Sequence, residues 1–173
     1  MSTVTTVTPP TATATTTPGP YVGHAGETWW FGDSLFEFLI PNEATNGQLA
    51  VFRATMPEGF SPPRHIHTRE DEVFMIEQGE LCFDLDGKLL TAGAGTTLYV
   101  PRGVPHTFRV AAGVAQVVGI MTPGEFTGLF RTLGFAAEHR ALPEPGSVPL
   151  NVPAVMAEQL RRGTEVIGPP MKA

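Results

Sequence analysis

One stretch of the sequence, Gly59–Gly79, reads GFSPPRHIHTREDEVFMIEQG and decides the fold of this chain. It carries His65 and His67, which are two residues apart, and the carboxylate of Glu72 shortly after them. On an extended strand, side chains two residues apart point to the same face, so the two imidazoles are expected side by side. The stretch therefore predicts a strand that presents two histidines to one interior.

A second stretch, Gly95–His106, reads GTTLYVPRGVPH and supplies a third histidine. Its Pro101 and Gly103 are turn formers, and the turn that they bracket would return His106 toward the same interior. Three imidazoles and one carboxylate form a complete ligand set for a divalent transition metal ion, with open positions left for water or substrate. We predict that one such ion, whether Mn, Fe, Co, Ni, Cu or Zn, binds to His65, His67, Glu72 and His106.

Around these two stretches, short strand-like runs separated by turn signals dominate the chain. In Leu81–Leu85 apolar and polar residues alternate, which is the period of a half-buried strand, and Asp86-Gly87 marks a hairpin turn after it. The clearest runs are Ser34–Ile40, Gln48–Met56, Glu72–Ile76, Leu81–Leu85, Thr96–Val100 and Ala115–Met121. They predict a small all-β barrel or sandwich, followed by helical segments at Glu125–Thr132 and Pro153–Arg162.

Length and composition limit the classes of function. With 173 residues the chain fits one domain, and its 42% hydrophobic residues suffice for a core. A net charge of −6 leaves no basic surface for nucleic acid or an anionic membrane. No apolar stretch approaches the roughly 20 residues that span a bilayer, and the single Cys82 has no partner for an intrachain disulfide.

The N-terminal segment differs from the rest of the chain. Nine of residues 1–17 are threonine, and prolines interrupt any regular pattern, so this segment buries too little apolar surface to offset the entropy of ordering it. We expect a disordered Thr/Pro-rich arm over residues 1–20 and a folded domain over residues 21–173. Because the arm lacks the pattern of a secretory signal, a cytoplasmic location is expected.

The spacing of the two stretches resembles the two motifs of the cupin superfamily. Gly59-x5-His65-x-His67-x4-Glu72-x6-Gly79 matches the first motif, and Gly95-x5-Pro101-x-Gly103-x2-His106 matches the second up to its last position, where Val110 replaces the usual Asn. The segments Thr28–Gly32, Pro63–Phe74 and Val100–Phe108 are most similar to small single-domain cupins of the quercetinase-like group. The resemblance implies a jelly-roll barrel, a double-stranded β-helix, with one or two short C-terminal helices.

The resemblance also implies a function. Quercetinases use a metal ion held by three histidines and a glutamate to bind a flavonol and add dioxygen, opening the heterocycle with loss of carbon monoxide. The corresponding residues here are His65, His67, His106 and Glu72, so a metal-dependent dioxygenase acting on a flavonol or similar aromatic enol is expected. Glu72 is the carboxylate that the motif places beside the enol proton, and we expect it to act as the catalytic general base as well as a ligand.

Alternation along the strands predicts the lining of a substrate pocket. Phe74 and Ile76 share the face of Glu72, Phe108 shares the face of His106, and Tyr99 lies just upstream on the preceding strand. Phe52 and Met121, together with Trp29, Trp30 and Met56, are further candidates. Such a cavity suits a flat aromatic molecule that is neutral or weakly acidic.

Two other functions fit the same residues. One is a metal-dependent cupin enzyme without redox chemistry, such as an isomerase, cyclase or decarboxylase acting on a natural-product intermediate. The other is a non-catalytic cupin that binds a small molecule, because the fold alone does not imply catalysis. In each case a homodimer is expected, since an all-β domain has strand edges to cover. His24 and His139 are expected outside the metal site, either at the surface or as hydrogen-bonded core residues.

Overall fold

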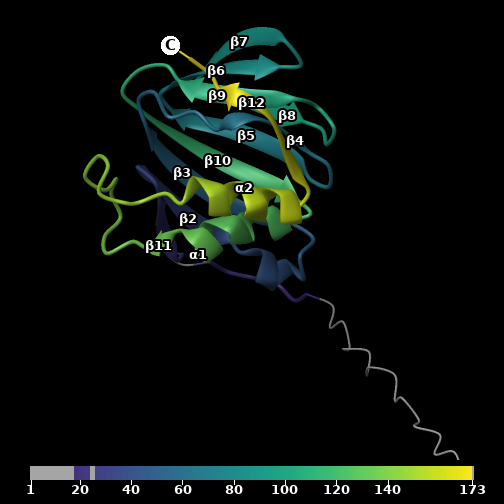
Figure 1. The fold of residues 1–173 in the computed structure, drawn as a ribbon. Helices are drawn as coiled ribbons and strands as arrows, with labels where there is room; N and C mark the ends of the chain where they lie inside the picture. The colour runs from purple at the N-terminus through teal and green to yellow at the C-terminus, as the bar shows by residue number, and fades with distance from the viewer. Residues whose placement is uncertain (1–17, 24–25, 173) are drawn as a thin grey trace, which may run out of the picture.

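The computed structural model describes residues 18–23 and 26–172 of the chain (Figure 1). Residues 1–17 of the predicted arm, and His24, lie outside the described residues. The strands are β1 (Thr28–Phe31), β2 (Ser34–Ile40), β3 (Ala50–Pro57), β4 (Pro63–His67), β5 (Asp71–Gln78), β6 (Glu80–Leu85), β7 (Lys88–Gly93), β8 (Thr97–Val100), β9 (His106–Val110), β10 (Val114–Thr122), β11 (Phe135–Ala136) and β12 (Thr164–Pro170). The helices are the 3₁₀ turns η1 (Asn42–Thr45) and η2 (Glu125–Thr127) and the α-helices α1 (Gly128–Leu133) and α2 (Val152–Arg161).

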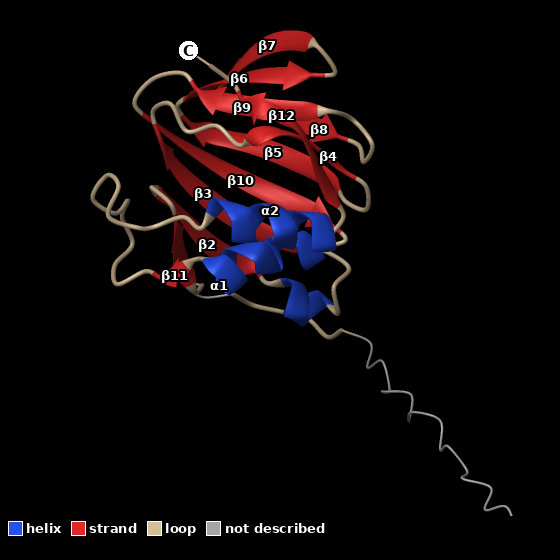
Figure 2. Cartoon of the chain, viewed as in Figure 1, coloured by secondary structure: helices blue, strands red, loops and turns tan. Residues whose placement is uncertain are grey.

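The strands form two sheets in which neighbouring strands run antiparallel (Figure 2). The larger sheet has the order β11-β1-β2-β3-β10-β5-β8, and the smaller has the order β12-β4-β9-β6-β7. The sheets pack through aromatic side chains, because the ring of Phe74 on β5 lies 5.3 Å from Phe83 on β6 and 5.6 Å from Phe108 on β9, between centroids. This architecture confirms the predicted all-β jelly-roll barrel.

Strict alternation of side chains builds the wall of the barrel. In β3 every second residue is buried and faces the interior, and β10 repeats the pattern beside it. Gly119 of β10 is the register partner of Phe52, and a Cβ atom at position 119 would lie 2.3 Å from the Phe52 ring. The glycine therefore leaves the space in which the Phe52 ring lies inside the barrel.

All six predicted strands correspond to strands of the structure. Ser34–Ile40 coincides with β2, and the five other predicted strands overlap β3, β5, β6, β8 and β10 with ends shifted by one or two residues. Strand β12 was not predicted, because its Gly168-Pro169-Pro170 end is typical of a loop. It forms because it occupies the edge of the smaller sheet beside β4, where proline does not interrupt hydrogen bonding on both sides.

The two helical predictions are confirmed in position, but the first predicted helix consists of two elements. Glu125–Thr132 begins as η2 and continues as α1, while α2 begins one residue before Pro153. The side chain of Asn151 caps α2 by accepting from the backbone nitrogen of Ala154 at 3.2 Å. At Gly128, where η2 passes into α1, a Cβ atom would lie 2.6 Å from the Arg162 guanidinium, so the glycine leaves room for that side chain.

The two α-helices lie side by side on one face of the molecule, in front of the larger sheet in Figure 2. Helix α1 contacts β1, and α2 contacts β12. Arg162, just after α2, joins them because it donates to the carbonyl of Glu125 and pairs with Glu158 at 2.7 Å. Among the described residues, no helix combines the length and hydropathy that a transmembrane span requires.

Candidate metal centre

Strand β4 positions the first two candidate ligands. His65 and His67 alternate with Ile66, so both imidazoles point into the barrel, where both side chains are buried. Their Nε2 atoms lie 3.2 Å apart. The strand is fixed on one side by β12, whose Val166 and Thr164 are the register partners of His65 and His67.

The turn between β8 and β9 positions the third candidate ligand, His106. His106 is the first residue of β9 and the register partner of His65 on β4. The backbone nitrogen of Gly103, in the turn, donates to the carbonyl of His67 at 2.8 Å and ties the turn to the end of β4. As a result, the ring nitrogens of His65, His67 and His106 lie within 4.8 Å of one another.

Glu72 reaches the same point from the other sheet. Its carboxylate Oε2 on β5 lies 3.5 Å from Nε2 of His67 and 3.4 Å from Nε2 of His106. The neighbouring Asp71 accepts from both the backbone nitrogen and the side chain of Arg102 at 2.9 Å, which fixes the start of β5 to the turn before His106. Arg102 also lowers the pKa of Asp71 to about 2, so this link persists over the physiological range. All four predicted ligands are thus brought together.

Hydrogen bonds on the outer side of each ring fix how the imidazoles face inward. Nδ1 of His65 donates to the carbonyl of Pro63 at 2.7 Å, and Nδ1 of His106 donates to the carbonyl of Val104 at 2.9 Å. Because a carbonyl only accepts, the neutral form of each ring carries its proton on Nδ1 and a lone pair on Nε2. Nδ1 of His67 has the Thr164 hydroxyl as its partner at 3.0 Å.

This arrangement fits a bound metal ion. The Nε2 atom of His106 is buried and has no hydrogen-bond partner among the described residues, and it lies within 4.8 Å of the ring nitrogens of His65 and His67. Two nitrogens bound to one ion at about 2.1 Å and at nearly a right angle would be about 3.0 Å apart, close to the 3.2 Å between His65 and His67. The three-histidine cluster can therefore hold a transition metal ion, and the four donors do not select one metal over another.

The electrostatics of the site favour the metal-binding forms of His65 and Glu72, whereas Glu72 favours the protonated form of His106. Burial, together with the neighbouring His106 and His67, lowers the pKa of His65 to about 3 and keeps its imidazole neutral. Burial is the largest single influence and opposes ionisation of Glu72, but the neighbouring histidines together outweigh burial and lower the pKa of Glu72. Burial also disfavours the charged form of His106, but the Glu72 carboxylate and the hydrogen bond to the Val104 carbonyl together outweigh burial and raise the pKa of His106. Cations bind a carboxylate and neutral imidazoles, so a bound metal ion would displace the proton that Glu72 favours on His106.

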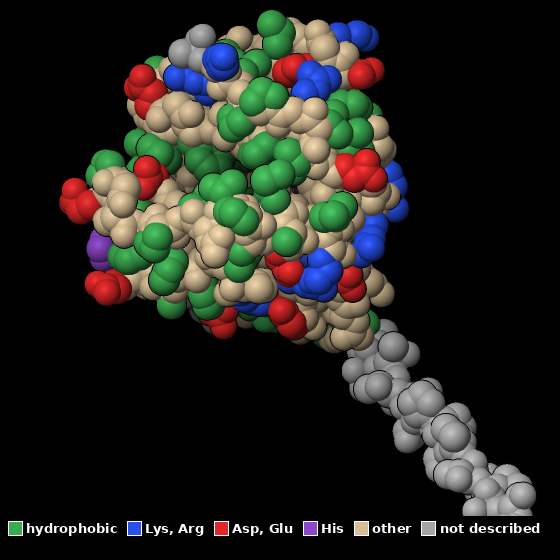
Figure 3. All heavy atoms as spheres, viewed as in Figure 1, with side chains coloured by type: hydrophobic (Ala, Val, Ile, Leu, Met, Phe, Trp, Pro, Cys, Tyr) green, Lys and Arg blue, Asp and Glu red, His purple; other side chains and the backbone are tan. Residues whose placement is uncertain are grey.

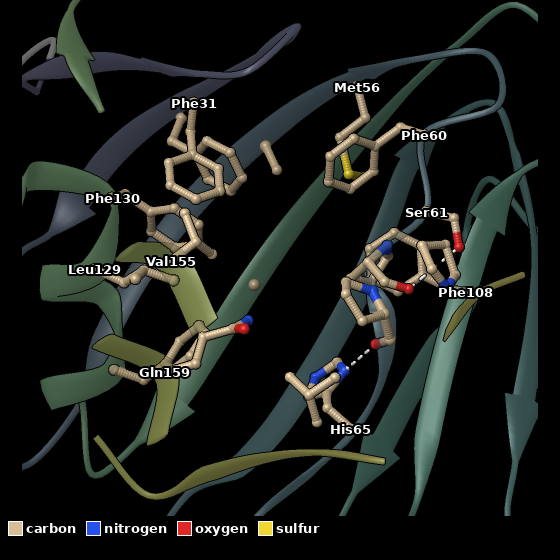
Figure 4. Close-up of a pocket in the computed structure, with 18 of the residues that line it drawn as sticks. Phe31, Met56, Phe60, Ser61, His65, Phe108, Leu129, Phe130, Val155 and Gln159 are labelled. Atoms are coloured by element: carbon tan, nitrogen blue, oxygen red, sulfur yellow. Dashed lines mark hydrogen bonds between the residues drawn. The ribbon is translucent and has the colours of Figure 1, made fainter. Parts of the chain in front are cut away.

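His65, His67 and Glu72 line a cavity of about 500 Å³, a volume within the range typical of small-molecule sites. Figure 4 shows His65 and Phe108 on the strand side, and Phe130, Val155 and Gln159 on the helix side. The lining is almost wholly apolar, with Phe31, Phe36, Phe52, Phe60, Phe74, Phe108, Phe126 and Phe130 as its aromatic members. Figure 3 shows hydrophobic side chains gathered on the hollowed face that carries α2.

The predicted pocket residues fall into three groups. Phe52, Phe74 and Phe108 line the cavity. Ile76 and Met121 are buried on inward-facing positions but are not among its lining residues. Tyr99 does not line it: its register partner is Val73, on the outward-facing parity of β5, and its side chain is 59% exposed. The alternation that places Glu72 and Phe74 inside places Tyr99 outside.

The remaining sequence candidates also lie elsewhere or in other roles. Met56 lines the cavity, while Trp29 packs against the core and Trp30 donates to the carbonyl of Ala141 at 2.8 Å. His139 is exposed and lies against Trp30, as expected of a surface histidine. Val110 replaces the motif Asn as a fully buried core residue, and its backbone pairs with Gly59 and Phe60.

The sequence did not predict several residues of the site. Thr164 contacts His67 from a strand that was not predicted, and the buried carboxylate of Glu70 lies 3.7 Å from Nδ1 of His67. Phe126, from the turn η2, stacks edge-on against the His67 ring at 4.7 Å between centroids. Gln159 reaches the cavity from α2. Gln159 could have been found from the sequence, because it is a polar residue on the buried face of a predicted helix. No sequence pattern pointed to Thr164 or Glu70.

Comparison with known proteins adds an independent line of evidence. The family described as the cupin domain matches residues 52–122, which include all four candidate ligands. The chain is similar to quercetin 2,3-dioxygenase of Bacillus subtilis (strain 168), with 31% identity over 126 residues, covering 72% of this chain and 37% of that protein. It is also similar to the HTH-type transcriptional regulator PuuR of Escherichia coli (strain K12), with 26% identity over 89 residues, covering 51% of this chain and 48% of that protein. The chain thus spans less than half the length of either relative.

Solved structures show the same fold. An RmlC-like cupin from Shewanella frigidimarina NCIMB 400 aligns with a TM-score of 0.53 and 19% identity, over 63% of this chain and 96% of that one. A predicted oxalate decarboxylase from Thermotoga maritima aligns with a TM-score of 0.52 and 21% identity, over 57% of this chain and 92% of that one. These alignments show the fold, and the matched cupin domain together with the similarity to the dioxygenase identifies the chain as a member of the cupin superfamily.

Proposed function

We propose that the chain is a metal-dependent dioxygenase of quercetinase type that acts on a flavonol or a similar aromatic enol. The observation that carries the proposal is the convergence of three buried imidazoles and Glu72 on the wall of a cavity lined with aromatic rings. The 31% identity to quercetin 2,3-dioxygenase of Bacillus subtilis supports the same class of reaction. Since that match covers 37% of the relative, the proposal depends on the chemistry of the site itself.

In this proposal His65, His67 and His106 hold the ion through Nε2, and Glu72 is the fourth ligand. A bound divalent transition metal ion would supply a Lewis acid for the enol oxygen of the substrate and redox capacity for reaction with dioxygen. The outward hydrogen bonds to Pro63 and Val104 keep the rings in the tautomer that this binding requires.

Glu72 has a second role as the general base. Its Oε2 atom is ionised within the buried site and accepts the proton of the enol hydroxyl, which leaves the substrate as an anion. The rest of the cavity presents no other carboxylate among its lining residues. The phenylalanine walls exclude water and hold a planar substrate by stacking, which favours an aromatic enol over a phosphate or a sugar.

Oxygen consumption by protein of known metal content tests the proposal. Elemental analysis of the native protein identifies the metal, and an oxygen electrode then records uptake with a panel of flavonols while released carbon monoxide is measured. Uptake together with carbon monoxide release supports the proposal. Substrate conversion without uptake would assign a non-redox reaction such as isomerisation or decarboxylation, and tight binding without conversion would assign a binding protein. A chain that neither contains nor takes up a transition metal would overturn the proposal.

Two expectations from the sequence remain predictions. Light scattering during size-exclusion chromatography tests the homodimer, and fractionation of the source cells tests the cytoplasmic location.

A further inference from the structure

The cavity has two separate polar regions. One is the cluster of His65, His67 and Glu72 on the strand side, and the other is the amide of Gln159 on helix α2. The remaining polar side chain among the lining residues is Ser61. Its hydroxyl already has hydrogen-bond partners, because it accepts from the backbone nitrogen of Met171 at 2.9 Å and donates to the carbonyl of Pro62 at 3.3 Å. Figure 4 shows the Gln159 amide pointing from the helix side into the cavity.

The carbonyl oxygen of the Gln159 amide is buried without a partner among the described residues. The residue is 7% exposed, and its carbonyl oxygen has no hydrogen-bond partner in the described part of the chain. A buried amide oxygen that has lost water without gaining a donor is unfavourable. Phe130, Leu129 and Val155, which line the same helix side of the cavity, are apolar and offer the amide no hydrogen-bond donor.

The fold itself does not require an amide at this position. The buried residues of α2 are Val155 and Gln159, one helical turn apart, and an apolar side chain at 159 would pack on the same face at no desolvation cost. The helix is held by other contacts: Asn151 caps its start, and Glu158 pairs with Arg161 and Arg162 at its end. The amide therefore serves something other than docking of α2.

We propose that Gln159 is a specificity-determining residue that hydrogen-bonds a hydroxyl or carbonyl oxygen at the end of the substrate remote from the enol, while the enol oxygen lies at the histidine cluster. This inference rests on the proposed function and narrows its substrate class to flat aromatic enols that carry a further polar group. An amide both donates and accepts, so it recognises either kind of oxygen. A substrate with an apolar end would leave the amide unpaired, and sites of this kind discriminate strongly against such analogues.

Binding of two flavonols to the metal-loaded protein tests the inference. Titration under argon, where no dioxygen is present, compares 3-hydroxyflavone with its polyhydroxylated relative quercetin in the wild type and in Gln159→Leu. The quantity of interest is the preference, the ratio of the two dissociation constants, because it cancels general differences in affinity. We expect the wild type to prefer quercetin and Gln159→Leu to lose about tenfold or more of that preference. Gln159→Met, with an unbranched side chain of similar length, serves as a second variant, and both are checked by circular dichroism.

A matched control separates recognition from packing. Val155→Ala, one turn away on the same helix, enlarges the cavity without changing its polarity, and it should weaken both flavonols by the same factor. A preference in both folded Gln159 variants that stays within about twofold of the wild type would overturn the inference while leaving the proposed function intact. If metal-loaded wild type binds neither flavonol, the proposed function fails, and this inference fails with it.

Discussion

His65 on β4 and His106 on β9 are register partners, and this one pairing brings the ligands of two distant sequence motifs to the same point. The turn that carries Gly103 completes the link by donating to the carbonyl of His67. Glu72 then reaches the cluster from the opposite sheet. The candidate metal centre therefore depends on the packing of the two sheets against each other. The role of each ligand can be tested by replacing one residue at a time.

Removal of one imidazole should abolish metal binding. In His106→Ala the cluster loses a buried donor whose Nε2 has no other partner, and metal content should fall from about one ion per chain to near zero. Elemental analysis after gel filtration measures the change. His139→Ala is the control, because that histidine is exposed and lies against Trp30, and it should keep full occupancy.

Replacement of Glu72 by glutamine should separate catalysis from metal binding. Glu72→Gln keeps the shape and an oxygen ligand but removes the base, so turnover of a flavonol at saturating metal should fall by about 100-fold or more. Oxygen uptake and metal content are measured on the same sample. If the metal-loaded variant retained full turnover, the assignment of Glu72 as base would be wrong.

Loss of the Thr164 hydroxyl should weaken metal binding without removing a ligand. Thr164→Val deletes the partner of His67 Nδ1, which fixes the orientation of that ring, so metal affinity should fall by about 10–100-fold. Competition with a chromogenic chelator measures the affinity. The exposed Thr91→Val on β7 is the matched control and should have no effect; equal affinities in wild type and Thr164→Val would contradict the role given to Thr164.

Two motif glycines should differ in their contribution to stability. Both Gly79 and Gly95 have positive φ, but only at Gly79 would a Cβ atom meet backbone, 2.7 Å from the carbonyl oxygen of Val114. Gly95→Ala should cost about 1–2 kcal/mol of unfolding free energy from its dihedral angles alone, and Gly79→Ala about 3 kcal/mol or more. Urea denaturation of both variants gives the comparison, and equal losses would show that the close approach to Val114 is unimportant.

Acid should loosen the end of helix α2. Hydrogen bonds from Arg161 and Arg162 lower the pKa of Glu158 from 4.5 to about 2. Because the folded-state pKa is depressed, the ionised carboxylate stabilises the fold above about pH 4.5, and this contribution disappears as the pH falls toward about 2. At pH 7 we expect Glu158→Gln to melt about 1–3 °C below the wild type. Thermal melts across the acid range should show this difference shrinking to zero, and a constant difference would exclude the mechanism.

Local patterns in the sequence were enough for the class of fold and for the four candidate ligands. The alternation in β3 and the glycine and proline spacing around His65, Glu72 and His106 are short-range signals, so a strand, a turn and a facing direction follow from neighbouring residues. For the same reason Phe74 and Phe108 were placed in the pocket. Tyr99 was misplaced because the parity of β8 depends on its register with β5, which no local pattern contains.

The tertiary structure alone decided the surroundings of the centre. Strand β12 and helix α2 come from the end of the chain, yet they place Thr164 against His67 and Gln159 in the cavity. Their positions depend on pairing with β4 and on packing against α1, contacts between segments far apart in sequence. The sequence by itself thus determined a barrel with a histidine-rich centre, while the folded chain determined which side chains orient the imidazoles and which polar group faces them, because those depend on distances across the barrel.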